Sequence, residues 1–292
     1  MGEKGGIKHF IMGLVIGAAA WPPGLSGGVV AVLFGIYERL IDDLNNLRRK
    51  IKEDFAFIFS VGLGLIVGII IMAFAVKWAL EDSRRAVTMF LFAGLIIGQI
   101  PSLVKISKKG EKVRPPHIMW FAIGLAILMA LLALDLMTDN ADRGAMIDSS
   151  ATMVAVAFAI LVGVLFGLTT IIPGISGATV LLALGLFTWM NDFITGMELI
   201  KFIPFALGFV ITIFAVGRIM GYILKNYHHA VYYFILGLTV GSTILILVTS
   251  YVYDITGTTD LFYGIAACAA GTAISLALSS IKVKQKDNGS PA

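Results

Sequence analysis

Charged residues and cysteine are both scarce in this chain. Aspartate, glutamate, lysine and arginine make up 14% of its 292 residues, hydrophobic residues make up 58%, and the mean hydropathy is +0.93. Soluble domains carry about a quarter charged residues, so this composition excludes a soluble globular protein and indicates a chain that folds in a bilayer. The single cysteine, Cys268, lies in an apolar run, which excludes disulfides within the chain and cysteine-rich metal sites.

The motifs that would indicate an enzyme are also missing. No glycine-rich Walker loop and no zinc-binding helix motif occurs, and the four histidines do not stand with basic residues as a lipid phosphatase would require. We therefore expect a protein that is not an enzyme and uses no cofactor. The net charge of +4 does not indicate a nucleic-acid partner, because the basic residues lie in short loops between apolar runs.

The chain does contain an internal repeat, which a shift of 150 positions brings out. The shift places nine residues on residues of the same type: Gly13, Gly17, Pro23, Gly24, Ser26, Gly27, Val30, Gly35 and Asp42 on Gly163, Gly167, Pro173, Gly174, Ser176, Gly177, Val180, Gly185 and Asp192. Such a repeat predicts two copies of one supersecondary unit. We expect a single transmembrane domain over residues 1–292, with repeat 1 at 7–136, repeat 2 at 151–281 and a cytoplasmic tail at 282–292.

The core of each copy is a Pro-Gly-aliphatic-Ser-Gly element. We call residues 23–27 the first motif and residues 173–177 the second motif. Each lies between two apolar arms of about 15 residues, which as helices would rise only about 22 Å against a hydrocarbon core of about 30 Å. Proline removes a backbone donor and glycine permits non-helical torsion angles, so each motif should end one half-helix and begin another at membrane depth. The arms could then form a re-entrant hairpin or one kinked span.

The distribution of lysine and arginine distinguishes these two arrangements, since both residues concentrate in cytoplasmic loops. If both hairpins are re-entrant, six spans remain, near residues 55–76, 87–104, 118–136, 202–224, 230–251 and 261–281. Of the 22 lysines and arginines, 17 then lie on one side, and the other side holds only Lys77, Arg84, Arg85, Arg143 and Lys201. We therefore predict an all-α polytopic membrane protein with an inverted repeat, each half a re-entrant helical hairpin plus three transmembrane helices. Both termini should be cytoplasmic and the protein should lie in the plasma membrane.

The two motifs are candidate anion-binding sites. The amides that follow each break lie at helix N-termini without intrahelical partners, and such positions favour anions. The candidate substrate-binding residues are Pro23, Gly24, Ser26, Gly27 and Gly28 in the first copy and Pro173, Gly174, Ser176 and Gly177 in the second. Two such ends facing each other near the midplane would suit a phosphate. The alternative is structural: the small residues let helices pack closely, and each serine caps its own helix.

A second group of candidates is charged. Glu38 and Arg39 follow the first motif, and Arg218 lies inside an otherwise apolar span. An arginine within a span is a functional-site hypothesis, and the two arginines could guide an anionic headgroup, with Glu38 as counter-ion or proton-linked partner. The alternative is that both arginines snorkel to the interface. The second copy has Phe187-Thr188-Trp189 in place of Tyr37-Glu38-Arg39, so any coupling charge should lie mainly in the first half.

Two segments together carry a family resemblance. They are Gly13 to Glu38, with Pro-Pro-Gly-Leu-Ser-Gly-Gly and Gly-Ile-Tyr-Glu, and Ile172 to Thr179, with Ile-Pro-Gly-Ile-Ser-Gly-Ala-Thr. The chain resembles, over nearly its whole length, the prokaryotic polyprenyl-phosphate (undecaprenyl-phosphate) translocase family, formerly an integral-membrane domain of unknown function. The resemblance implies a transporter that moves undecaprenyl phosphate, or dolichyl phosphate in an archaeon, from the outer to the inner leaflet for reuse. It also implies that residues 23–28 and 173–178, with Glu38 and Arg39, form the substrate site.

The leading hypothesis is a lipid-phosphate translocase, or flippase, that holds the phosphate of a polyprenyl phosphate at the two motifs. Two alternatives remain open: a transporter or channel for a small soluble anion, and a non-transporting membrane scaffold. The expected partners are the polyprenyl-phosphate lipid and the bilayer. A coupling ion, either a proton or sodium, and a homo-oligomer also remain open.

Overall fold

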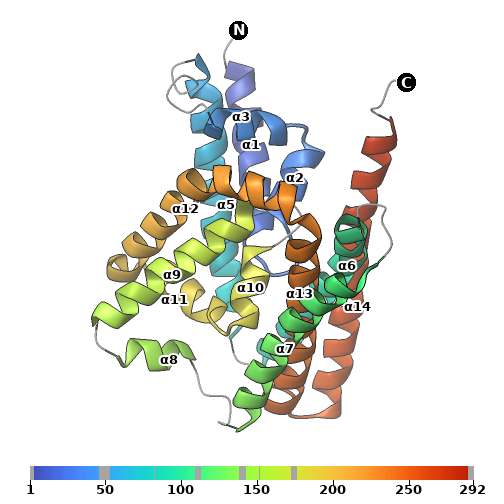
Figure 1. Ribbon diagram of the computed structural model, residues 1–292. Coiled ribbons are helices and arrows are strands. Elements are labelled where there is room, and N and C mark those ends of the chain that lie inside the picture. Colours follow the sequence, from blue (N-terminus) through green and yellow to red (C-terminus); the bar gives the residue numbers. More distant parts are fainter. Residues whose placement is uncertain are drawn as a thin grey trace.

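The computed structural model of the chain describes residues 3–45, 53–81, 83–108, 113–137, 143–150, 152–171 and 176–288, and every regular element within these ranges is an α-helix (Figure 1). The first half contains α1 (Glu3–Ala20), α2 (Gly27–Leu33), α3 (Tyr37–Asn45), α5 (Phe55–Ala79), α6 (Arg84–Lys108) and α7 (Pro115–Met137). The second half follows α8 (Arg143–Asp148) and contains α9 (Thr152–Ile171), α10 (Gly177–Ala183), α11 (Phe187–Thr195), α12 (Leu199–Asn226), α13 (His228–Tyr253) and α14 (Thr258–Asn288). The predicted all-α class is confirmed.

The helices of the first half recur in the same order in the second half. Helices α2 and α10 have seven residues each, and α3 and α11 have nine. The bounds of each of these pairs differ by 150 positions, the shift that relates the two motifs. The local structure thus follows the sequence repeat, while the inversion of the two halves across the bilayer stays a prediction.

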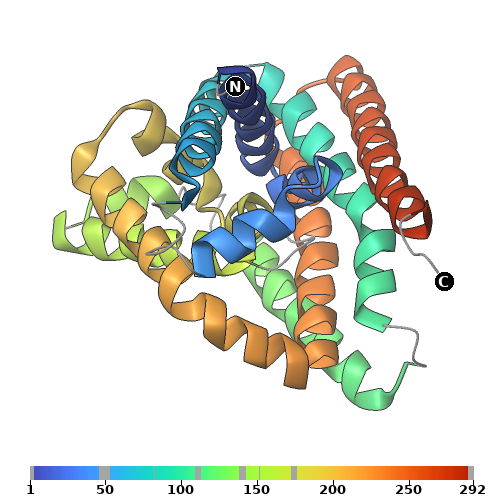
Figure 2. The same ribbon diagram turned by 90° about the horizontal axis from the view of Figure 1, so that it is seen from above.

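The long helices pack in pairs, and the pairs of the two halves match. Helix α1 packs along α5, and α9 packs along α12. The last helix of each half packs instead against the other half, α7 against α13 and α14 against α6 (Figure 2). Helices α6 and α13 also contact each other. These two helices therefore join the halves.

Glycines line the contacts within these pairs. A Cβ atom at Gly13 or Gly17 of α1 would lie 2.1 Å from a backbone carbonyl oxygen of α5. A Cβ atom at Gly64 or Gly68 of α5 would lie 2.1 Å from a backbone carbonyl oxygen of α1. A Cβ atom at Gly163 of α9 would lie equally close to a carbonyl oxygen of α12. Because lipid supplies no hydrophobic force that drives helices together, close backbone contacts of this kind stabilise the pairs.

Six helices within the described residues are long and apolar enough to cross a membrane, and five of them coincide with predicted spans. The sixth is α9, which was predicted to be a hairpin arm. The six helices are Phe55–Ala79, Arg84–Lys108, Pro115–Met137, Thr152–Thr170, His228–Tyr253 and Thr258–Leu278. The predicted span 202–224 lies in α12, where only Leu199–Ile213 counts as a shorter apolar helix and the side chains of 214–225 lie outside the described residues.

Helix α9 differs from the predicted short arm. The apolar part of α1, Gly6–Ala20, has the expected length, but α9 has 20 residues and passes as a span by length and composition. The reason lies in the sequence, because Phe158 and Ala159 stand where the first copy has the polar Lys8 and His9. The expectation of equal short arms is therefore wrong for the second copy.

Each arm that follows a motif bends at a glycine. Gly35 and Gly185 both have a φ of 69°, and Leu186 N donates to Leu181 O at 2.8 Å, the long hydrogen bond of a Schellman helix end. Helices α10 and α11 consequently meet at 115°. The expectation of one continuous arm of about 15 residues is wrong here, because a left-handed glycine ends the helix after seven residues.

The two hairpins are buried to different extents. The largest hydrophobic cluster surrounds the second hairpin, where Phe187, Phe193 and Met190 have no exposed surface. Trp21, at the end of α1, is 1% exposed and belongs to the same cluster. In α2, by contrast, Val29 is only half-buried. The second hairpin therefore forms much of the protein interior, and the first lies nearer the surface.

The ends of the described chain lie on one side. Figure 1 places the first turns of α1, helix α3 and the last turns of α14 at one end of the molecule. Helix α8 and the junction of α13 with α14 lie at the opposite end. This arrangement agrees with two termini on the same side of a membrane, and their cytoplasmic location stays a prediction.

We predict that Gly64→Ala destabilises the fold and that Gly62→Ala, on the same helix, does not. A methyl group at position 64 would lie 2.1 Å from the Phe10 carbonyl oxygen, whereas position 62 has no described atom within 4 Å. Overpacking of this kind costs about 1–3 kcal/mol. The apparent melting temperature in detergent should fall for Gly64→Ala only, and equal values for both variants would contradict the close contact of α1 with α5.

Candidate functional site

The first motif forms a tight turn between α1 and α2. Leu25 N donates to Pro22 O at 3.3 Å, and Gly24 has a φ of 81°, in the left-handed region. A Cβ atom at Gly24 would lie 2.5 Å from Leu95 Cβ and 2.7 Å from Ile96 N, both in α6. Only glycine fits at this position, because both its torsion angle and its contact with α6 exclude a side chain.

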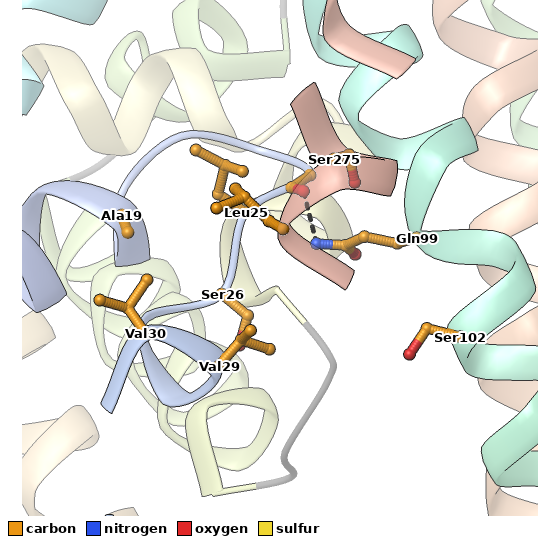
Figure 3. Close-up of a pocket in the computed structure, with 10 residues that line it drawn as sticks. Ala19, Leu25, Ser26, Val29, Val30, Gln99, Ser102 and Ser275 are labelled. Carbon is orange, nitrogen blue, oxygen red and sulfur yellow. Dashed lines mark hydrogen bonds between the residues drawn. The ribbon is translucent and has the colours of Figure 1, made fainter. Parts of the chain in front are cut away.

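A small pocket lies beside the first motif, between α2, α6 and α14 (Figure 3). Its volume is about 50 Å³, several times the space that one water molecule needs. The polar residues that line it are Ser26, Gln99, Ser102 and Ser275, and the apolar ones include Leu25, Val29, Val30 and Leu278. None of the described residues that line this pocket is charged. The pocket thus combines hydroxyl and amide groups with an apolar wall.

Two hydroxyl groups in this pocket are available to a ligand. Ser26, in the first motif, and Ser102, in α6, make no side-chain hydrogen bond with any residue that the structure describes. A serine hydroxyl can donate one hydrogen bond and accept others. Each of these hydroxyls can therefore bind a ligand atom or water without giving up an existing bond.

Polar side chains of other helices bind the peptide groups around Gly24. Thr179 Oγ1, in α10, accepts from Gly24 N at 2.8 Å, and Gln99 Nε2, in α6, donates to Gly24 O (Figure 3). Trp21 Nε1 donates to Asn191 Oδ1, in α11, at 2.8 Å, and both residues are 1% exposed. The first motif, together with Trp21 two residues before it, is thus bonded to both helices of the second hairpin.

The second motif is closed where the structure describes it. Ser176 is 3% exposed, and its hydroxyl caps α10 by accepting from Thr179 N at 3.4 Å. A Cβ atom at Gly177 would lie 2.6 Å from the Thr169 hydroxyl, so this glycine packs against α9. Pro173 and Gly174 lie outside the described residues. The structural alternative, a serine that caps its own helix, therefore describes Ser176, whereas Ser26 faces a pocket.

Arg39 lies away from the pocket, where α3 meets the start of α5. Its Nη2 binds Asp54 Oδ1 at 2.8 Å, and its guanidinium lies 3.6 Å from the centre of the Phe57 ring. Glu38 is in α3 and Arg218 is in α12, and the side chains of both lie outside the described part of the chain. The roles of these three residues stay predictions.

A larger hollow of about 430 Å³ lies between α8, α9 and the start of α12. Its lysine, Lys201, binds the carboxylates of Asp148 and Glu198, each at 2.7 Å, and Trp189 Nε1 donates to Asp148 at 2.8 Å. Burial raises the pKa of Asp148, but the hydrogen bonds from Lys201 and Trp189 outweigh burial and hold that pKa below its usual value. This lysine is therefore already paired with two carboxylates.

The sequence interpretation missed several polar residues of the site: Gln99, Ser102, Ser275, Thr179 and Asn191. Gln99 and Ser102 carried a usable signal, because they are polar residues one helical turn apart inside a predicted span. Serine and threonine hydroxyls in helices usually bond to the backbone of their own helix. The sequence therefore offered no reason to single out Ser275 or Thr179. Their importance follows only from the contacts between helices that are distant in the sequence.

The chain is similar to known transporters of lipid phosphates. A family model described as undecaprenyl phosphate translocase-like matches residues 16–261. A polyprenyl-phosphate transporter of Staphylococcus aureus is 27% identical over 249 residues, which cover 80% of this chain and 83% of the relative. A polyprenyl-phosphate transporter of Vibrio cholerae is 22% identical over 256 residues, or 81% of this chain and 76% of the relative. No solved structure gives a significant match.

The two motif serines should differ in their effect on stability. Ser176→Ala removes the cap of α10 and should lower the free energy of unfolding by about 0.5–1 kcal/mol, the lower range for such caps because the hydrogen bond is long. Ser26→Ala removes a hydroxyl that bonds to no described residue, so the stability should not change. Thermal unfolding in detergent measures both effects. A larger loss for Ser26→Ala than for Ser176→Ala would show that these roles are wrong.

Proposed function

Because the chain belongs to the undecaprenyl phosphate translocase-like family, we propose that it transports a polyprenyl phosphate across the membrane. Two relatives named polyprenyl-phosphate transporters support this class of substrate. The direction that we propose is from the outer to the inner leaflet of the plasma membrane, which returns the carrier lipid to the side where it is loaded again.

One observation carries the proposal: the pocket at the first motif combines available hydroxyl groups with an apolar wall. Ser26 and Ser102 would donate hydrogen bonds to phosphate oxygens. Leu25 and Val29 of the wall would contact the first isoprenoid unit. At about 50 Å³ the pocket is too small for the whole lipid chain, so the chain would stay in the bilayer while the headgroup crosses.

The described residues that line the pocket carry no charge, which has an energetic consequence. A phosphate in a low-dielectric site without a counter-charge is costly to desolvate. We therefore propose that a cation, either a proton or sodium, is transported together with the lipid. This cation would lower the net charge of the headgroup as it crosses. Arg39 and Arg218 would guide the headgroup between the pocket and the inner leaflet, with Glu38 as counter-ion or proton-linked partner.

The two motifs would hold the phosphate in turn. Ser26 faces a pocket while Ser176 is buried, as expected for a conformation that is open at one motif only. In the other conformation Ser176, with Gly174 and Gly177, would face a pocket and the first motif would close. The matching order of helices in the two halves supports such an exchange of roles.

Leaflet exchange in liposomes tests the proposed function. The purified protein is reconstituted with a fluorescent polyprenyl phosphate, and a membrane-impermeant quencher reports the fraction in the outer leaflet over time. We expect protein-dependent exchange of the phosphate lipid, faster under an imposed proton or sodium gradient, and no exchange of the non-phosphorylated polyprenol. Competition by water-soluble phosphate would favour the soluble-anion transporter, and no exchange under any gradient would favour the scaffold.

Arg39→Ala should slow this exchange about tenfold, the effect of losing one charge-assisted hydrogen bond to the headgroup. Arg84→Ala is the matched control, because Arg84 also lies over an aromatic ring, Trp78 at 4.4 Å, and pairs with a carboxylate, Glu81 at 3.5 Å. The control variant should exchange lipid at the wild-type rate. Equal losses in both variants would mean that Arg39 supports the fold and not the route of the headgroup.

A further inference from the structure

The peptide groups on both sides of Gly24 are held from two different helices. The N–H group of Gly24 donates to Thr179 Oγ1 at 2.8 Å, and its carbonyl accepts from Gln99 Nε2. Gly24 is buried and Thr179 is 5% exposed, so the bond between them is shielded from water. A buried peptide group without a partner is strongly unfavourable, and the two side chains therefore fix the orientation of this part of the chain.

The orientation of Gly24 determines where Ser26 points. Gly24 turns the chain with a φ of 81°, and Ser26 follows two residues later at the start of α2, where its carbonyl accepts from Val29 N at 3.1 Å. With the Gly24 peptide groups fixed, the Ser26 side chain lies in the pocket that Gln99 and Ser102 also line (Figure 3). The two hydrogen bonds thus hold the chain directly before Ser26, whose side chain lines the pocket.

Thr179 also connects the two motifs. Its own amide donates to Ser176 Oγ at 3.4 Å, while its hydroxyl oxygen accepts from Gly24 N. A continuous series of hydrogen bonds thus runs from Ser176 through Thr179 and Gly24 to Gln99.

The corresponding positions of the repeat do not reproduce this arrangement. Val29 stands 150 positions before Thr179 and has no side-chain hydrogen-bonding group. Thr249 stands 150 positions after Gln99, and its hydroxyl donates to two carbonyl groups of its own helix. The polar pair is therefore specific to the first motif and is not required by the duplicated fold.

We infer that Thr179 and Gln99 are positioning residues for phosphate binding: they hold the Gly24 peptide groups so that Ser26 stays aimed into the pocket. The inference rests on the proposed function, because it concerns the same pocket. Thr179 does not line the pocket and acts on the phosphate only through the first motif. Gln99 lines the pocket, but its Nε2 is bonded to Gly24.

The test measures the initial rate of leaflet exchange against the mole fraction of fluorescent polyprenyl phosphate. Thr179→Val keeps the shape of the side chain but removes the hydroxyl, and it should raise the half-saturating mole fraction about fivefold with little change in the maximal rate. Thr179→Ser keeps the hydroxyl and should restore wild-type saturation. The matched control is Thr239→Val, since Thr239 is also buried, at 7% exposed, and its hydroxyl donates to Ile235 O in its own helix. This control should saturate like the wild type.

Gln99→Leu is the second variant, and it tests the inference on its own if Thr179→Val does not fold. It should raise the half-saturating mole fraction to a similar extent, and the double variant should exceed either single variant only slightly, because both bonds hold one residue. Wild-type saturation in Thr179→Val and Gln99→Leu, or a lower maximal rate with unchanged saturation, would overturn the inference and leave the proposed function standing. No exchange by the wild-type protein would overturn the proposed function, and the inference with it.

Discussion

A helix that breaks inside a bilayer exposes backbone groups that lipid cannot satisfy, so each break needs partners within the protein. At the first motif these partners come from α6 and α10, through the bonds of Gln99 and Thr179 to Gly24. At the bend after α2 they are local, since Ile36 N donates to Ala31 O at 3.1 Å. Helices α6 and α10 must therefore lie against the first motif for the break to be stable. The same break leaves the Ser26 hydroxyl in a pocket and not within a continuous helix.

The two halves share one plan but divide their roles. The second hairpin is buried, its serine caps its own helix, and its aromatic residues form the largest hydrophobic cluster. The first hairpin lies nearer the surface and borders the pocket. It is held to the second by the bond from Trp21 to Asn191 as well as by the bond from Gly24 to Thr179. A duplicated fold can thus use one copy as the framework that orients the other.

The sequence alone predicted the all-α class, five of the six long apolar helices and the relation of the two motifs, because hydropathy and the 150-residue shift report these features directly. The lengths of the arms were wrong, since hydropathy does not detect a bend when both sides of it are apolar. Gly35 and Gly185 were visible as matching glycines, but only their positive φ shows that each ends a helix. Ser26 was named as a candidate from its motif, and its binding role stays a prediction, whereas Gln99 and Thr179 lie 75 and 155 residues from Gly24. Their bonds depend on the packing of α6 and α10 against the first motif, which no local pattern encodes.

Chemical protection of the pocket wall is the most direct test of a phosphate site at the first motif. A Ser102→Cys variant in a Cys268→Ala background carries a single cysteine, in the wall of the pocket that Ser26 borders. We expect polyprenyl phosphate to slow the reaction of this cysteine with a small thiol reagent, and a polyprenol of the same length to leave the rate unchanged. Equal protection by both lipids, or by neither, would contradict a phosphate site beside Ser26.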